Sequence, residues 1–136
     1  MTALGYTLAA VLAVAIVTIQ AMAQPAPLEP VRYSARVAYV IDGDTLALDG
    51  VEPRIRLWGV DAPERDQRGA QAATDALKSL AGQGVRVSYI QIDRDRYSRI
   101  VARVFLPDGR EINRMMIEGG TATEFCRYSK GFYGRC

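Results

Sequence analysis

The sequence contains no histidine, only two cysteines and only two lysines among its 136 residues. Without an imidazole, the chain cannot build a serine–histidine–aspartate triad, a histidine-paired cysteine nucleophile or a histidine-ligated zinc site. Two cysteines alone cannot complete a four-ligand zinc site either. Any chemistry must therefore use carboxylates, guanidinium groups, hydroxyls or a metal ion bound by oxygen, for which calcium and magnesium are the first candidates.

The charges are nearly balanced, with 17 basic residues against 15 acidic ones and a net charge of +2. All basic residues except Lys78 and Lys130 are arginine. Arginine suits bidentate binding of phosphate, but a genomic preference for arginine codons explains the same bias. Composition alone therefore does not decide between function classes.

The first 23 residues carry no charged side chain. Leu8 to Ile19 is apolar, and Ala21-Met22-Ala23 has the small-x-small pattern of a signal-peptidase site before Gln24. We therefore expect residues 1–23 to be a cleaved signal peptide and the protein to be periplasmic or secreted. The alternative is a retained anchor in contact with the membrane, because the apolar stretch approaches the roughly 20 residues that span a bilayer.

Three prolines in the segment 24–31 predict an extended linker, and 32–136 then forms one domain with its own core. Cys126 and Cys136 both lie in the last eleven residues. In an oxidising compartment we expect them to form a disulfide that closes the tail. Two unpaired thiols remain the alternative.

Hydrophobic periodicity and turn residues predict five strands and two helices. The strands are expected at 32–41, 45–48, 54–60, 85–92 and 100–105, and the helices at 67–80 and 112–118. Asp49-Gly50 is a hairpin turn signal, and no third helix fits before Cys136. This order predicts an α+β fold, a β-barrel with helices, in which five strands form a Greek-key barrel of the OB type.

The first acidic cluster is Asp42-Gly43-Asp44-Thr45. Two carboxylates two residues apart on an extended backbone point to one face, and the glycine permits a tight bend or close approach of another group. Such a segment between strands is more often only a turn.

The second cluster ends in Asp61 and Glu64, separated by a rigid Pro63, where the third expected strand runs out. Strand alternation makes Arg56 and Asp61 face opposite ways. A bend near Gly59 is therefore needed to bring them to one site. A third cluster, residues 93–99, is rich in arginine and joins the last two expected strands; a solvated hairpin is its plain interpretation.

Together these segments resemble the thermonuclease family, the staphylococcal-nuclease-like OB-fold domain. The resemblance runs from about Val37 to Ala122. It rests on four blocks in order, Val40-Ile41-Asp42-Gly43-Asp44-Thr45, Arg56-Leu57 with Val60-Asp61-Ala62-Pro63-Glu64, Asp95-Arg96-Tyr97-Ser98-Arg99, and Glu118-Gly119-Gly120-Thr121-Ala122.

The resemblance implies a role for each matching residue. It assigns Asp44, Asp61 and the Ala62 carbonyl to a calcium ion, Glu64 to the general base, and Arg56 and Arg99 to the phosphate. Tyr97 and Tyr128 are the expected substrate-binding tyrosines. Of the family's two tail tyrosines, one aligns with Cys126 and the other with Tyr128, so Tyr128, Phe132 or Tyr133 could stack on a base. Packing of these rings over the barrel end is the alternative.

The expected function is thus an exported, calcium-dependent phosphodiesterase that cuts DNA and RNA with little sequence preference and leaves 3′-phosphates. We expect a monomer without a protein partner. One alternative is a catalytically inactive OB-fold module that binds nucleic acid. The presence of all five expected side chains argues against it: Asp44, Arg56, Asp61, Glu64 and Arg99. Another is a domain that calcium only stabilises, which gives no role to Glu64, Arg56 and Arg99.

Overall fold

The computed structural model describes residues 25–136, so the expected signal peptide lies outside the described part. Residues 25–32 form no helix or strand and are exposed, and the first strand, β1, is Tyr33–Asp42. Among the described residues, no helix combines the length and the apolar character needed to cross a membrane.

Five strands close into a barrel in the order β1, β2, β3, β6, β5, with β5 pairing back onto β1. The other bounds are Thr45–Leu48 for β2, Val51–Leu57 for β3, Arg86–Arg94 for β5 and Ile100–Phe105 for β6. Only β3 and β6 run parallel within this barrel. The predicted five-stranded barrel is confirmed.

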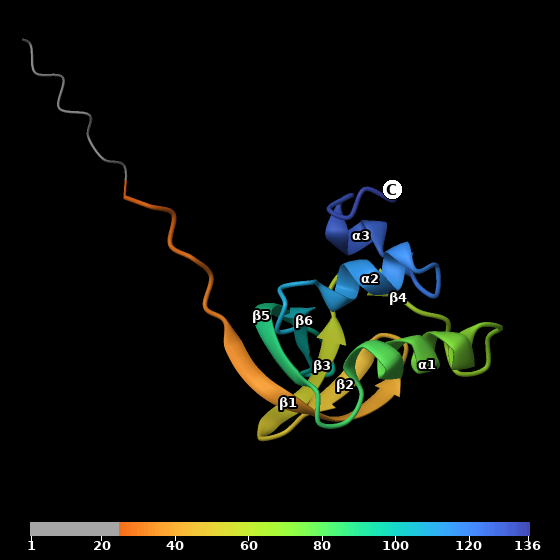
Figure 1. The fold of residues 1–136 in the computed structure, drawn as a ribbon. Helices are drawn as coiled ribbons and strands as arrows, with labels where there is room; N and C mark the ends of the chain where they lie inside the picture. Colours follow the sequence, from red (N-terminus) through yellow and green to blue (C-terminus); the bar gives the residue numbers. More distant parts are fainter. Residues whose placement is uncertain (1–24) are drawn as a thin grey trace, which may run out of the picture.

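The barrel interior is filled by alternate residues of the strands, as the strand period requires. In β6, for example, Ile100, Ala102 and Val104 are buried. Helix α1 (Ala70–Ala81) packs against β1, and its buried face contains Ala73 and Leu77. Figure 1 shows α1 beside the barrel, with α2 (Ile112–Glu118) and the C-terminal segment gathered at one end.

The single strand predicted at 54–60 is in fact two strands. Gly59 has a φ of +69°, which turns the chain after β3, and Val60–Asp61 then forms a separate strand, β4. β4 pairs with β7 (Thr123–Glu124) in a small sheet outside the barrel. The expected bend near Gly59 therefore exists, whereas the pairing partner of Asp61 was not predicted.

The expectation that no third helix fits before Cys136 is wrong, because α3 spans Cys126–Ser129. This short helix is held by contacts that no local pattern reveals. Cys126 and Cys136 are joined by the expected disulfide. The buried Glu124 carboxylate accepts hydrogen bonds from Ser129 Oγ (2.5 Å) and from the Tyr133 N–H (2.9 Å).

Helix α1 also starts later than predicted, at Ala70 instead of Gln67. The Gln67 side-chain oxygen accepts a hydrogen bond from the Glu64 N–H (2.8 Å), which closes a turn before the helix. Gly69 then adopts a φ of +89° immediately before Ala70. Residues 65–69 therefore form turns that separate Glu64 from the helix.

Candidate active site

The turn between β1 and β2 carries Asp42 and Asp44, and Gly43 allows this turn to lie close to α1 and to the segment after β4. A Cβ atom on Gly43 would lie 2.5 Å from the Ala73 Cβ atom of α1 and 2.8 Å from the Ala62 Cβ atom. Both distances are shorter than van der Waals contact allows. Only glycine therefore lets this turn touch both α1 and the segment after β4.

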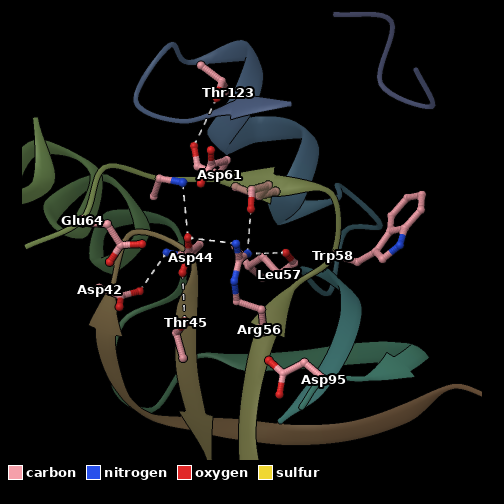
Figure 2. A network of polar contacts seen from close by, with 12 residues as sticks. Asp42, Asp44, Thr45, Arg56, Leu57, Trp58, Asp61, Glu64, Asp95 and Thr123 are labelled. Atoms are coloured by element: carbon pink, nitrogen blue, oxygen red, sulfur yellow. Dashed lines mark hydrogen bonds and ion pairs between the residues drawn. The ribbon is translucent and has the colours of Figure 1, made fainter. Parts of the chain in front are cut away.

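Asp44 is the centre of the polar network in Figure 2. Its Oδ1 accepts a hydrogen bond from Thr45 Oγ1 (2.9 Å), and its Oδ2 accepts one from the Ala62 N–H (3.2 Å). Arg56 Nη2 lies 3.3 Å from the same Oδ2. Asp42 supports the turn through its Oδ1, which accepts the Asp44 N–H (3.1 Å).

Arg56 is held in place mainly by backbone carbonyls. Its Nη1 donates to Leu57 O (2.8 Å) and to Val60 O (2.6 Å), on either side of the bend at Gly59. Because Nη1 has two hydrogens, both are used inside the protein. The Nε and Nη2 edge of the guanidinium keeps donors for a further acceptor, and a two-pronged edge of this kind fits a phosphate.

Burial is the main reason why the pKa of Asp44 is raised from 3.8 to about 6. Arg56 acts against this rise, and the neighbouring charge of Asp42 adds to it. The ion pair with Arg56 therefore does not fully offset the cost of burying the Asp44 carboxylate in its anionic form. The Asp42 and Asp44 carboxylates of this turn are oxygen ligands of the kind that a hard cation such as calcium takes. The site thus fits the predicted ion chemically.

Asp61 and Glu64 lie in the chain segment that follows Arg56 and are both exposed. They line a hollow of about 670 Å³ together with Ala62 and the segment 120–123. Thr123 Oγ1 donates to the Asp61 carbonyl (3.4 Å) across the β4–β7 pair. Figure 2 shows Glu64 on the same side of Asp44 as Asp42, away from Arg56.

Arg99 lies in the loop after β5 and depends on Asp95, to which sequence reasoning gave no role of its own. Arg99 Nε donates to Asp95 Oδ2 (2.6 Å), and the backbone N–H groups of Tyr97 and Arg99 donate to Asp95 Oδ1 (2.9 and 3.0 Å). Desolvation alone would raise the pKa of Asp95, but these bonds from Arg99 and Tyr97 outweigh it and lower the pKa. The four-residue spacing of Asp95 and Arg99 was the signal in the sequence that could have indicated this ion pair.

A second cleft, of about 760 Å³, lies beside the first hollow and contains both predicted arginines. Its charged lining residues are Arg56, Arg94, Arg96, Arg99 and Arg127 against Asp93 and Asp95. Its aromatic lining residues are Trp58, Tyr97, Phe125 and Tyr128. Both predicted substrate-binding tyrosines are therefore in the cleft, and 64% of Tyr97 and 58% of Tyr128 is exposed.

The other two candidate stacking residues have different environments. Tyr133 is buried, and its hydroxyl donates to Glu111 Oε1 (2.5 Å), so its ring packs inside the protein. Burial, followed by this contact, raises the pKa of Tyr133. Phe132 remains 47% exposed and meets Trp58 edge to face, with ring centroids 5.3 Å apart.

The fold and the site together define a closed OB-type barrel with an acidic hollow next to an arginine-lined and aromatic cleft. Residues 54–134 match the family model described as staphylococcal nuclease homologue, and the chain belongs to this family. The matched range contains Arg56, Asp61, Glu64 and Arg99, whereas Asp44 precedes it. The resemblance stated from the sequence motifs is thus confirmed.

Three relatives illustrate the match. The chain is 44% identical over 97 residues to an Escherichia coli protein named uncharacterized endonuclease, covering 69% of this chain and 62% of that protein. It is 39% identical over 109 residues to the Rhizobium meliloti succinoglycan biosynthesis protein ExoI, covering 71% and 54%. It is 31% identical over 134 residues to the thermonuclease of Staphylococcus hyicus, covering 86% and 78%. The chain thus spans less than two thirds of the first two relatives.

Proposed function

We propose that the chain is an exported, calcium-dependent nuclease that hydrolyses phosphodiester bonds of DNA and RNA with little sequence preference. The observation that carries the proposal is the junction of two surfaces: Asp44 is tied to Ala62 and to Arg56, and Arg56 also lines the cleft that contains Arg99. Family membership and relatives named endonuclease and thermonuclease support it.

Calcium would be held by Asp44, Asp61 and the Ala62 carbonyl, and when bound it would neutralise the phosphodiester and help to position water. In our proposal, the exposed Glu64 carboxylate takes a proton from that water as the water oxygen bonds to phosphorus. The bond from phosphorus to the leaving 5′-oxygen breaks, and this oxygen takes up a proton from solvent. The products are a 3′-phosphate and a 5′-hydroxyl.

The two arginines would act on the charge that accumulates on the phosphoryl oxygens. Arg56 offers its Nε and Nη2 edge, and Arg99 offers the two terminal nitrogens that its contact with Asp95 leaves available. One well-placed donor of this kind contributes about 3 kcal/mol to transition-state stabilisation. Lysine could not supply the same two-pronged contact.

The test is cleavage of single-stranded DNA by the purified protein, with calcium or with a chelator. We expect calcium-dependent cleavage, a decrease in kcat of about 10² to 10⁴-fold for Glu64→Gln, and a loss of about 3 kcal/mol in transition-state binding for Arg99→Ala. Asp49→Asn, in an exposed hairpin turn, is the matched control and should cleave normally. Cleavage that is unaffected by the chelator would reject the calcium assignment. Binding without any cleavage would favour an inactive nucleic-acid-binding module.

A further inference from the structure

The cleft beside the acidic hollow has two walls that come from different parts of the chain. The loop between β5 and β6 supplies Tyr97 and Arg99, and the C-terminal segment 125–136, here called the tail, supplies Arg127 and Tyr128. The volume of about 760 Å³ lies in the upper part of the roughly 300 to 1,000 Å³ that small-molecule sites occupy. The cleft therefore has the volume of a ligand site, with walls from two separate segments.

We propose that the tail forms a second nucleotide subsite, in which Arg127 binds a phosphate next to the scissile one and Trp58, supported by Phe132, stacks on the adjoining base. The subsite rests on the proposed nuclease function, since it extends the same cleft. Its ligand is a single-stranded DNA or RNA segment longer than a dinucleotide. None of these three residues belongs to the sequence blocks that define the catalytic assignment.

Arg127 differs from the other arginines of the cleft in its contacts. Arg94 donates to the Ser98 carbonyl, Arg96 to the Tyr97 hydroxyl and Arg99 to Asp95. Within residues 25–136, the exposed Arg127 side chain makes no hydrogen bond and no ion pair. All its donors are therefore open to a ligand. The lining contains five arginines and two aspartates, and this excess of positive charge favours the binding of an anion.

Trp58 provides a stacking surface in the cleft, and Phe132 supports it from outside the lining. Trp58 lines the cleft, and Figure 2 shows its ring directed away from Asp44 and the acidic network. The exposed Phe132 ring packs edge to face on Trp58, and the Arg103 guanidinium lies 4.7 Å from the Phe132 centroid. A supported ring in the same cleft as a free arginine is the combination that binds single strands without reading their sequence.

The tail is fixed firmly enough to act as a wall. The disulfide joins its two ends, the Phe125 N–H donates to the Gly59 carbonyl (2.8 Å), and the Arg135 N–H donates to the Glu124 carboxylate (2.7 Å). A side chain on such a segment loses less freedom on binding than one on a mobile terminus. The subsite is therefore preorganised.

The test measures binding by fluorescence anisotropy on the full chain carrying Glu64→Gln, with a thymidine dinucleotide and with an oligothymidylate of about eight nucleotides. Arg127→Ala is expected to weaken binding of the longer ligand about tenfold and to reduce the slope of log K against log salt by about 0.7. Binding of the dinucleotide should not change. Trp58→Leu should also weaken binding of the longer ligand about tenfold but leave the salt slope unchanged, because it removes stacking and no charge.

Arg135→Ala is the matched control, since it removes the same charge from the same tail outside the cleft lining. The subsite is overturned if Arg127→Ala and Arg135→Ala lose the same binding affinity. It is also overturned if Arg127→Ala loses equal affinity for both ligands, or loses none. Absence of any oligonucleotide binding would overturn it as well. Cleavage is read separately: length-dependent binding through Arg127 by a wild-type chain that cuts nothing would reject the nuclease function and leave the subsite standing.

Discussion

Among single residues, Arg99 is the proposed phosphate ligand whose position depends on another side chain. The Asp95 carboxylate accepts the Arg99 Nε and both nearby backbone N–H groups, so it fixes the loop and the guanidinium together. Replacing it by asparagine keeps the shape and removes the charge. We expect Asp95→Asn to lower kcat about tenfold, because hydrogen bonds to charged groups contribute about 1.5 to 3 kcal/mol.

A positioning role is separated from a merely structural one by a double-mutant cycle. In an Arg99→Ala background, Asp95→Asn should have no further effect on kcat, although it should still lower the thermal stability. Asp108→Asn is the control, because Asp108 pairs with Arg110 in an exposed turn outside the cleft lining, and it should leave kcat unchanged. A full additional loss of kcat in the Arg99→Ala background would contradict this role of Asp95.

The acids and arginines of the site could be picked out from the sequence because four blocks in order resemble the thermonuclease family, whereas each cluster by itself is typical of a turn or a hairpin. Asp44 and Arg56 do meet, and Gly59 does bend the chain as strand alternation required. The role of Asp95 could not be read in the same way, since it depends on a loop closing back on itself. The role proposed for Arg127 likewise depends on the opposite wall of the cleft, which comes from a distant part of the sequence.

Among the elements, the tail depends on the buried carboxylate of Glu124. Besides Ser129 and Tyr133, this carboxylate accepts the Arg135 N–H, and it lies on the strand that pairs with β4. Desolvation alone would raise the pKa of Glu124, but the hydrogen bonds from Ser129, Tyr133 and Arg135 lower it below its ordinary 4.5. The ionised form is therefore the one that holds the tail.

The sign of the pH dependence follows from this shift. A carboxylate with a lowered pKa stabilises the fold fully above its unfolded pKa, and the stabilisation disappears as the pH falls below 4.5 through the folded pKa. Urea unfolding from pH 7 to pH 3 should show that Glu124→Gln is destabilising at neutral pH and nearly neutral in acid. The surface variant Glu118→Gln should show no such convergence. A constant difference between Glu124→Gln and wild type at every pH would contradict the prediction.

The elements that could be predicted are those with their own local signal. β2, β6 and α2 match the expected ranges because apolar spacing indicates each of them and a glycine or proline follows each closely. β4, β7 and α3 are two to four residues long, too short for any periodicity. They exist because of contacts between distant segments, such as the bond from the Phe125 N–H to the Gly59 carbonyl.

For the whole molecule, the decisive question is whether calcium binds the folded state. A ligand that binds only the folded state stabilises it, by about 2.7 kcal/mol at about 100 times its Kd. We expect calcium to raise the melting temperature and a chelator to reverse the rise. Asp44→Asn and Asp61→Asn should each abolish the shift, whereas Asp49→Asn in the exposed hairpin turn should retain it. An equal calcium shift in all three variants would contradict the assigned ligands.

The pairing of β4 with β7 also has a consequence for how the protein is made. Synthesis proceeds from the N-terminus, so the strand that carries Asp61 is translated long before its partner β7, which begins at Thr123. The tail wall of the cleft follows later still. The barrel strands are all complete by Phe105, but the cleft wall also needs Phe125, Arg127 and Tyr128. A nascent chain therefore completes this wall only after all five barrel strands have been translated.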